Sequence, residues 1–420
     1  MPRPKKTPAT TEDKIAQQVV KSVQQPNQNK LRKLIALKQK WEKDHPGCHF
    51  LLGYELPPDP GNIRRPCGIM PLDIDTGGGL PAGKMVKIAG DDNAGKTSLL
   101  YLYMAMNQRI YGEDSVVALA ATEYYPDYFQ MRKLGCMVPI PTEILDNIDL
   151  ARTSRGMPPY TGDERKELQT GIGQFVLLRS NDGEGLLMET LALLESNMCQ
   201  IIGIDSMNMV QPNAEQVKDL DHDAKMAAQA SLVTRFQREL HNEVMRLDRQ
   251  QLNRTTIIEI NQMRANTKGG PYQSEKKVAQ DYASKHGSAT TLRLSSGEKI
   301  RHGKGETATV IGKHWIWDVV KGKHGTHDNI RGSWRYMYES LFDIFGSVLV
   351  SGIAYGTIVE KAGQLSVAGP TGEIVLENVD AAKFRQVLRD DPKLDLLVRT
   401  AIMNKAGVEN AVLCDTSVLS

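Results

Sequence analysis

The segment Gly90-Asp91-Asp92-Asn93-Ala94-Gly95-Lys96-Thr97 carries residue types whose spacing suits the binding of phosphate groups. It fits the pattern Gly-x-x-x-x-Gly-Lys-Thr/Ser at every defined position. Backbone N–H groups of such a loop, with the N-terminus of a following helix, form a concave site for anions. The lysine can reach the β- and γ-phosphates, and the threonine hydroxyl can ligate Mg²⁺. A glycine-rich turn that binds no nucleotide is the alternative.

The residues on either side of this phosphate loop predict the elements that would hold it in place. Residues 85–89 are typical of a short buried strand, and residues 98–105 are typical of a helix. A strand, a glycine-rich turn and a helix in this order are what phosphate binding requires. We therefore expect a nucleoside triphosphate and Mg²⁺ as ligands, with Ser98 among the nucleotide contacts and Thr97 among the metal ligands.

Two acidic residues follow apolar runs that are typical of strands. Asp205 comes directly after residues 201–204, where a carboxylate can hold Mg²⁺ opposite Thr97. Glu123 follows residues 116–120, where a carboxylate can orient or deprotonate the water that attacks a γ-phosphate. A turn aspartate and a helix-capping glutamate are the simpler alternatives. Because the phosphate loop is also present, we favour the metal and catalytic roles.

An amide, Gln262, follows a further apolar run at residues 256–260. It can hydrogen-bond a γ-phosphate without adding charge, which suits a group that senses ATP against ADP. Behind it, residues 264–286 show little apolar pattern but hold the cations and the aromatic ring that single-stranded nucleic acid binding uses. The candidate DNA contacts are Arg264, Lys268, Tyr272, Lys276 and Lys277. An ordinary solvated loop is the alternative.

Lys321 and Lys323 follow a strand-like run at residues 315–318. At a spacing of two on a strand, both side chains point the same way. They could complete a nucleotide site as an arginine finger does, although this composition alone favours surface charges.

Apolar runs and helical periods alternate between residues 67 and 294, with helical stretches at residues 186–195 and 224–249. This alternation predicts an α/β fold in which helices cover both faces of a mostly parallel twisted sheet. Such sheets bind ligands at the carboxyl ends of their strands. The proline- and glycine-containing residues 139–172 are interpreted as an inserted loop or small excursion without obvious chemistry.

Changes in composition divide the chain into three predicted regions. Residues 1–64 hold a basic tail, two helices (one from residue 12, one at residues 30–43) and a linker from residue 46. The two helices have narrow apolar stripes, so they must dock on the main domain or on a neighbouring subunit. Residues 65–338 form the ATPase core, and residues 339–420 form a small α/β C-terminal domain.

Composition narrows the class of protein. The 420 residues carry a formal net charge of +2, so any basic surface must be local. Five scattered cysteines argue against a disulfide framework or a cysteine-based zinc site. No apolar run approaches the roughly 18 residues of a membrane span, and no signal peptide is evident. We expect a cytoplasmic protein that makes no membrane contact.

Taken together, these motifs resemble the RecA family of homologous-recombination ATPases, and in particular its bacterial core. The similarity runs in order over about residues 65–400. Its elements are residues 68–73 and 78–84, the phosphate loop, Glu123 with Asp127, residues 132–135, residues 180–184, Asp205, residues 261–264, residues 319–323 and residues 352–363.

The resemblance implies several roles. Asp127 would contact adenine, and Gln130 stands where an adenine-stacking tyrosine is usual. Two DNA-binding loops would lie within residues 212–222 and 264–288. ATP would lie between subunits of a helical filament, with Lys321 and Lys323 supplied by the neighbour. The dissimilar N-terminus, the extra residues 139–172 and the missing acidic tail fit a divergent member of the family, either phage-encoded or of another source.

The function expected from the sequence is therefore a DNA-dependent ATPase that forms filaments on single-stranded DNA. It would catalyse homologous pairing and strand exchange with double-stranded DNA in recombination and repair of DNA damage. Its expected partners are DNA, further copies of itself, and single-strand-binding and loader proteins, at the nucleoid or in a host cytoplasm. Two alternatives remain: a hexameric helicase or DNA motor on the same fold, and a non-catalytic ATP-binding recombination mediator.

Overall fold

The computed structural model describes residues 28–45, 63–180, 182–213, 222–249, 254–264, 277–278, 287–303 and 308–408. The chain divides into two compact units, residues 1–59 and 60–420. In the first unit, α2 (Gln28–Asp44) covers the helix predicted at residues 30–43 and exposes Leu34, Leu37 and Trp41. The helix predicted from residue 12 and residues 46–62 of the linker predicted at residues 46–64 lie outside the described residues.

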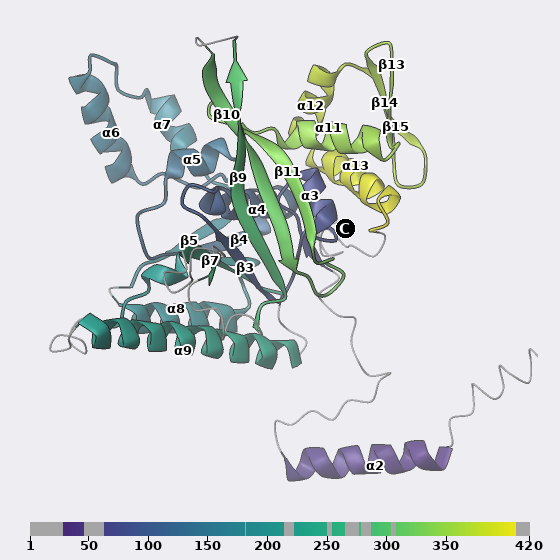
Figure 1. Cartoon of the computed structure of the whole chain (residues 1–420). Coiled ribbons are helices and arrows are strands. Elements are labelled where there is room, and N and C mark those ends of the chain that lie inside the picture. The colour runs from purple at the N-terminus through teal and green to yellow at the C-terminus, as the bar shows by residue number, and fades with distance from the viewer. Residues whose placement is uncertain are drawn as a thin grey trace, which may run out of the picture. The chain divides into compact units, whose positions relative to one another are not determined.

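A large mixed sheet forms the centre of the second unit (Figure 1). Its strand order is β12-β11-β10-β9-β3-β7-β6-β4-β5, and the strands from β9 to β5 run parallel to one another. The bounds are β3 (Met85–Gly90), β4 (Val116–Ala121), β5 (Gln174–Leu178), β6 (Ile201–Asp205), β7 (Thr256–Arg264), β9 (Thr290–His302), β10 (Thr309–Lys321), β11 (Ile330–Met337) and β12 (Leu341–Phe342). β8 (Lys277–Val278) pairs with β7. Antiparallel pairing adds β10, β11 and β12 at one side.

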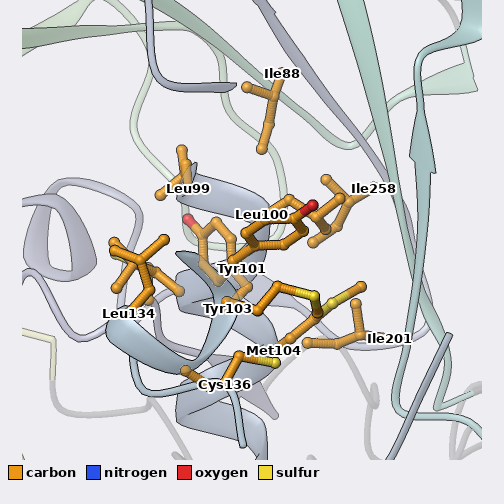
Figure 2. Packing of buried hydrophobic residues seen from close by; sticks show 14 of the residues in the cluster. Ile88, Leu99, Leu100, Tyr101, Tyr103, Met104, Leu134, Cys136, Ile201 and Ile258 are labelled. Atoms are coloured by element: carbon orange, nitrogen blue, oxygen red, sulfur yellow. The ribbon is translucent and has the colours of Figure 1, made fainter. Parts of the chain in front are cut away.

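Helices cover both faces of the parallel strands, which confirms the predicted fold class. Along β4, Val117 and Leu119 pack into the cluster that contains α4 (Lys96–Tyr111). The alternate residues Ala118 and Ala120 pack with α8 (Gly183–Ser196) and α9 (His222–Arg249). Figure 2 shows side chains of α4 packed among Ile88, Ile201 and Ile258 of the sheet. Burial on two faces explains why these strands read as continuous apolar runs.

α4 lies unusually close to β6 at Gly203. A Cβ atom there would come within 2.6 Å of a Leu100 methyl group, so any larger residue would require Leu100 to shift. The close approach holds the helix that carries Lys96 and Thr97 against the strand that ends in Asp205.

Residues 139–172 contain two helices, so of their interpretation as an inserted loop or small excursion the loop is wrong. After α5 (Tyr128–Lys133) the chain forms α6 (Thr142–Ser154) and α7 (Gly162–Gln169). Arg165 joins the two helices through Asp146 and Asp149, each at 2.5 Å. Thr161 and Glu164 form a capping box at the start of α7. A threonine followed three residues later by a glutamate is a sequence pattern that indicates the start of a helix.

The C-terminal elements build a separate hydrophobic cluster beside β10 and β11 (Figure 1). They are α11 (Ile344–Ala354), β13 (Ile358–Lys361), β14 (Gln364–Ala368), β15 (Ile374–Val379), α12 (Ala381–Asp390) and α13 (Pro392–Lys405). Fully buried Arg399 donates to Asp395 and to the Gly68 carbonyl, both at 2.9 Å, and ties α13 to the sheet-bearing part. The predicted boundary at residues 338/339 stays a prediction.

Smaller elements complete the second unit near its start. They are β1 (Arg64–Arg65), α3 (Met70–Asp75) and β2 (Leu80–Pro81). Cys67, Cys136 and Cys199 are buried free thiols. No helix in the described part of the chain is both long and apolar enough to cross a membrane.

One buried ionisable pair lies inside the sheet. Lys87 on β3 stands opposite Glu259 on β7, and each is 3% exposed. Gln237 of α9 donates to Glu259 Oε2 at 3.1 Å. Burial raises the pKa of Glu259 from 4.5 to about 7, against the opposing effects of Lys87 and Gln237. Because the folded state holds this proton more tightly, Glu259 lowers stability as pH rises from 4.5 to about 7.

At pH 8, where Glu259 is mostly ionised, we expect Glu259→Leu to lower the free energy of unfolding by about 3–5 kcal/mol, because it removes the carboxylate that faces the buried Lys87 charge. Adding Lys87→Met should recover most of this loss, since apolar side chains replace such pairs at little cost. Urea unfolding at pH 5 and pH 8 measures both effects. A double variant no more stable than the single one, or one that keeps a wild-type pH slope, would contradict this account.

Candidate functional site

The phosphate loop joins the end of β3 to the start of α4. Gly95 occupies the N-cap position of α4 with φ +83°, a left-handed conformation that favours glycine. A Cβ atom on Gly95 would also lie 3.0 Å from Trp315 Nε1. Trp315 is fully buried and donates to the Ala94 carbonyl at 2.8 Å. The phosphate loop therefore packs against the Trp315 indole, which holds the loop close to β10.

Lys96 turns back over the loop. Its Nζ donates to the carbonyl of Asp91 at 2.7 Å and of Gly90 at 3.1 Å, and the residue is 8% exposed. Burial lowers the pKa of Lys96, and the nearby carboxylates of Asp92, Asp205, Glu123 and Asp91 oppose that shift. The ammonium group thus lies among acidic side chains at the mouth of the loop.

Thr97 and Asp205 lie together, as a shared Mg²⁺ site requires. The Thr97 hydroxyl donates to Asp205 Oδ2 at 2.7 Å. Burial raises the pKa of Asp205, while the Thr97 hydrogen bond and Lys96 favour the charged form and Glu123 disfavours it. A hydroxyl and a carboxylate side by side suit Mg²⁺, which keeps waters and phosphate oxygens as its other ligands. The described residues contain no cluster of three or more His, Cys, Asp or Glu that would make an all-protein metal cage.

Glu123 is held by two neighbours from different strands. Ser206 Oγ donates to Glu123 Oε1 at 2.5 Å, and Gln262 Nε2 approaches the same oxygen at 3.4 Å. The backbone N–H of Gln262 in turn donates to Asn208 Oδ1 at 3.2 Å. The candidate base and the candidate sensor are therefore in direct contact, and Ser206 and Asn208 position them. Sequence reasoning assigned no role to Ser206 or Asn208.

A cavity of about 670 Å³ connects these groups. Its lining contains most of the predicted nucleotide, metal and catalytic residues of this chain: Asp92, Asn93, Gly95, Lys96, Thr97, Ser98, Glu123, Gln130, Asp205 and Gln262. Gly90, Asp91 and Ala94 belong to the loop but do not line the cavity. Parallel strands bring Glu123, Asp205 and Gln262 to one edge of the sheet, although they are far apart in sequence.

The two candidate adenine contacts differ in position. Gln130 lines the cavity, and its Nε2 lies 3.4 Å from Ser98 Oγ. Asp127 does not line it and instead caps α5, accepting from the Gln130 N–H at 2.9 Å. Asp127 therefore contacts the backbone of Gln130, a lining residue, but not the cavity itself.

The antiparallel strands supply a wall that sequence reasoning missed. Lys313 of β10 donates to the Asn93 carbonyl at 2.7 Å and lines the cavity. Tyr336 of β11 and Tyr338, which follows that strand, line it too, with ring centroids 6.2 Å apart. Aromatic faces of this kind can stack on a nucleobase. Two tryptophans spaced by two residues, at 315 and 317, were the one available sequence signal for this wall.

Lys321 and Lys323 lie away from this cavity and do not line it. Lys321 is the last residue of β10 and donates to the Ser288 carbonyl, while Lys323 follows the strand. The prediction that both lysines lie on one strand is therefore wrong for Lys323. Both charges, after the larger effect of burial, help to lower the pKa of His241 on α9.

The candidate DNA-binding residues fall largely outside the described residues. Lys268, Tyr272 and Lys276 belong to this group, as does most of the loop expected at residues 212–222. The backbone of Arg264 ends β7 and pairs with Lys277 of β8. The predicted basic segment thus begins on β7, two residues after Gln262.

Comparison with known proteins supports a relationship to the RecA family. No protein-family model matches the chain. Protein RecA of Petrotoga mobilis is 28% identical over 298 residues, which cover 70% of this chain and 67% of that protein. Protein RecA of Thermotoga neapolitana is 24% identical over 374 residues, covering 89% and 92% respectively. Protein RecA of Methylococcus capsulatus is 25% identical over 357 residues, covering 84% and 87%.

We expect Trp315→Phe to weaken ATP binding roughly tenfold, because the Ala94 carbonyl loses its donor and the loop loses its support. The variant should also lose about 1–3 kcal/mol of stability. Calorimetric titration with ATP measures the binding.

Trp317→Phe is the matched control. Trp317 is also fully buried on β10, but its Nε1 donates to Asp75 at 2.8 Å rather than to the loop. It should lose similar stability and keep ATP affinity. Equal losses of affinity in both variants would show that Trp315 acts through general packing alone.

Proposed function

We propose that the protein is a DNA-dependent ATPase that forms helical filaments on single-stranded DNA and pairs them with homologous duplex. The observation that carries the proposal is the contact of Glu123 with Gln262 beside the Lys96–Thr97 loop and Asp205. Lys96 supplies a positive charge for phosphates, and Thr97 with Asp205 supplies a pair that can bind a metal ion. Glu123 is the candidate base, and Gln262 is a neutral amide. The similarity to bacterial RecA proteins over most of the chain supports the same function.

The geometry suits ATP hydrolysis. ATP would lie with its phosphates on the loop N–H groups and on Lys96, and with its base toward Gln130, Tyr336 and Tyr338. Mg²⁺ held at Thr97 and Asp205 would neutralise charge that develops on the phosphate oxygens. A water oriented by Glu123 attacks the γ-phosphorus, its proton passes to the carboxylate, and the bond to the β–γ bridging oxygen breaks to release ADP.

The same contact can link hydrolysis to DNA. Gln262 can hydrogen-bond either to Glu123 or to a γ-phosphate, so its position depends on the nucleotide. β7 continues from Gln262 to Arg264, where the basic segment begins. A shift at Gln262 therefore passes along two residues of strand to the proposed DNA-binding loop. DNA and ATP would each favour the same state and raise the affinity for the other.

The cavity would be completed by a neighbouring subunit. Lys321 and Lys323 lie away from the cavity of their own chain, which supports their use at the cavity of the next one. A head-to-tail contact of this kind generates a helical filament. The proposed setting is the cytoplasm, with single-strand-binding and loader proteins as partners.

Single-stranded DNA should stimulate ATP hydrolysis by the wild-type protein. Lys96→Ala should lose ATP binding, because the loop loses its only side-chain cation. Glu123→Gln should bind ATP and DNA but hydrolyse about 10²–10⁴-fold more slowly, since the base is gone and the amide keeps the shape. Phosphate release with and without DNA, together with ATP titration, separates these effects. Absence of DNA stimulation, or wild-type turnover in Glu123→Gln, would overturn the proposal.

Mixing two inactive variants tests whether the site is shared between subunits. Lys96→Ala has an intact lysine pair, and Lys321→Ala/Lys323→Ala has an intact loop. In a random filament of equal parts, about a quarter of the head-to-tail interfaces combine the intact halves. We therefore expect up to about a quarter of the wild-type activity from the mixture. No recovery in co-assembled filaments would place the lysines outside the neighbour's site.

A further inference from the structure

A second cavity, of about 860 Å³, lies apart from the candidate nucleotide site and shares no residue with it. We call it the basic groove. One wall comes from α4 and α5, together with Ile172 at the base of the α6–α7 excursion. The other comes from residues 340–345 and from the facing ends of α12 and α13. The groove therefore spans the junction between the sheet-bearing part and the C-terminal elements, whose helices are labelled in Figure 1.

The floor of the basic groove is apolar. Leu102 and Met106 of α4 face it, with Phe342 and Phe345 from the other wall. Flat aromatic rings and a flexible methionine accept apolar side chains of several shapes. A cavity of this size falls in the range that holds a ligand of several side chains.

The rim is strongly basic. Its charged residues are Arg109, Arg132, Lys133, Arg385 and Arg389, with Asp343 as the sole carboxylate of the lining. Arg109 donates hydrogen bonds to Asp395 and to carbonyls of α12. Arg132 donates to three carbonyls around the α6–α7 excursion. The side chains of Lys133 and Arg389 are exposed and make no hydrogen bond or ion pair with the residues that the structure describes. Arg389 stands over the ring of Phe345 at 5.7 Å.

The groove suits carboxylates better than a nucleotide. The N-termini of α11 and α13, which would attract phosphate, are already capped by Asp343 and Asp391. The side-chain amide of Gln108, which could read a base, is bonded to Met137 and Ile172. What the groove offers is an apolar floor between separate cations, at Lys133 on one wall and Arg389 on the other. Amphipathic peptides with acidic flanks match that pattern.

We propose that the basic groove binds a short acidic, amphipathic peptide segment of a partner protein. Apolar side chains of the peptide would rest on Met106 and Phe345, and its carboxylates would pair with Lys133 and Arg389. Because the two cations lie on different walls, a bound peptide would bridge α5 and α12. The proposal is independent of ATP hydrolysis, since none of these residues lines the candidate nucleotide site.

The probe is a fluorescent synthetic peptide in which Leu recurs at helical spacing among Glu residues, compared with its Gln-for-Glu analogue. We expect the acidic peptide to bind the full-length protein with a Kd of about 1–100 μM, and the neutral analogue to bind at least tenfold more weakly. Lys133→Glu/Arg389→Glu should weaken binding of the acidic peptide roughly tenfold or more. Lys383→Glu is the matched control, because Lys383 is exposed on α12 outside the groove.

A cysteine placed at Ser340, an exposed residue of the lining, reports occupancy directly. The acidic peptide should slow alkylation of Ser340→Cys, and the neutral analogue should not. Thermal unfolding and basal ATP hydrolysis of all variants should match the wild type, which excludes loss of fold. Equal binding of both peptides, equal binding by the charge-reversed and control variants, or protection of Ser340→Cys by ATP but not by peptide would overturn the proposal.

Discussion

The rest of the structure depends on the parallel pairing of β3 with β7, of β7 with β6, and of β6 with β4. Both faces of these strands are covered by helices, so their interiors must be apolar and their polar residues are confined to the ends. Because parallel strands end at the same edge, Gly90, Gln262, Asp205 and Glu123 meet there. The buried Lys87–Glu259 pair is the exception, and it lies mid-strand, where Gln237 of α9 donates to Glu259.

This constraint explains which parts of the site could be predicted. Glu123, Asp205 and Gln262 each follow an apolar run, and no knowledge of strand order is needed to place them at one edge. Lys313 and Tyr336 lie opposite each other on antiparallel strands, and that register is fixed by long-range pairing with shifts near Lys313. No local pattern carries such information. The helices at residues 142–154 and 162–169 were missed because nearby prolines and glycines outweighed the capping box at Thr161.

The residue that supports the phosphate loop and the residues proposed for its chemistry come from different parts of the sheet. Trp315 bonds to the Ala94 carbonyl and bars a side chain at Gly95, yet it belongs to the antiparallel extension rather than to the parallel core. The same strand carries Lys313 into the cavity and ends at Lys321. β10 therefore joins the candidate site of its own chain to the lysines proposed for the next one. A displacement of β10 would therefore move both the cavity wall at Lys313 and the lysine at the end of the strand, Lys321.

Among the described residues, carboxylates outnumber cations in the lining of the cavity. Asp91, Asp92, Asp205 and Glu123 all act on Lys96, and Lys313 is the one other cation of the lining. A polyphosphate adds several negative charges to a region already rich in carboxylates, which is unfavourable without further positive charge. A divalent cation at Thr97 and Asp205 supplies part of it. Two lysines from a neighbouring subunit would supply the rest, and nucleotide binding would then be coupled to assembly, since each would provide what the other lacks.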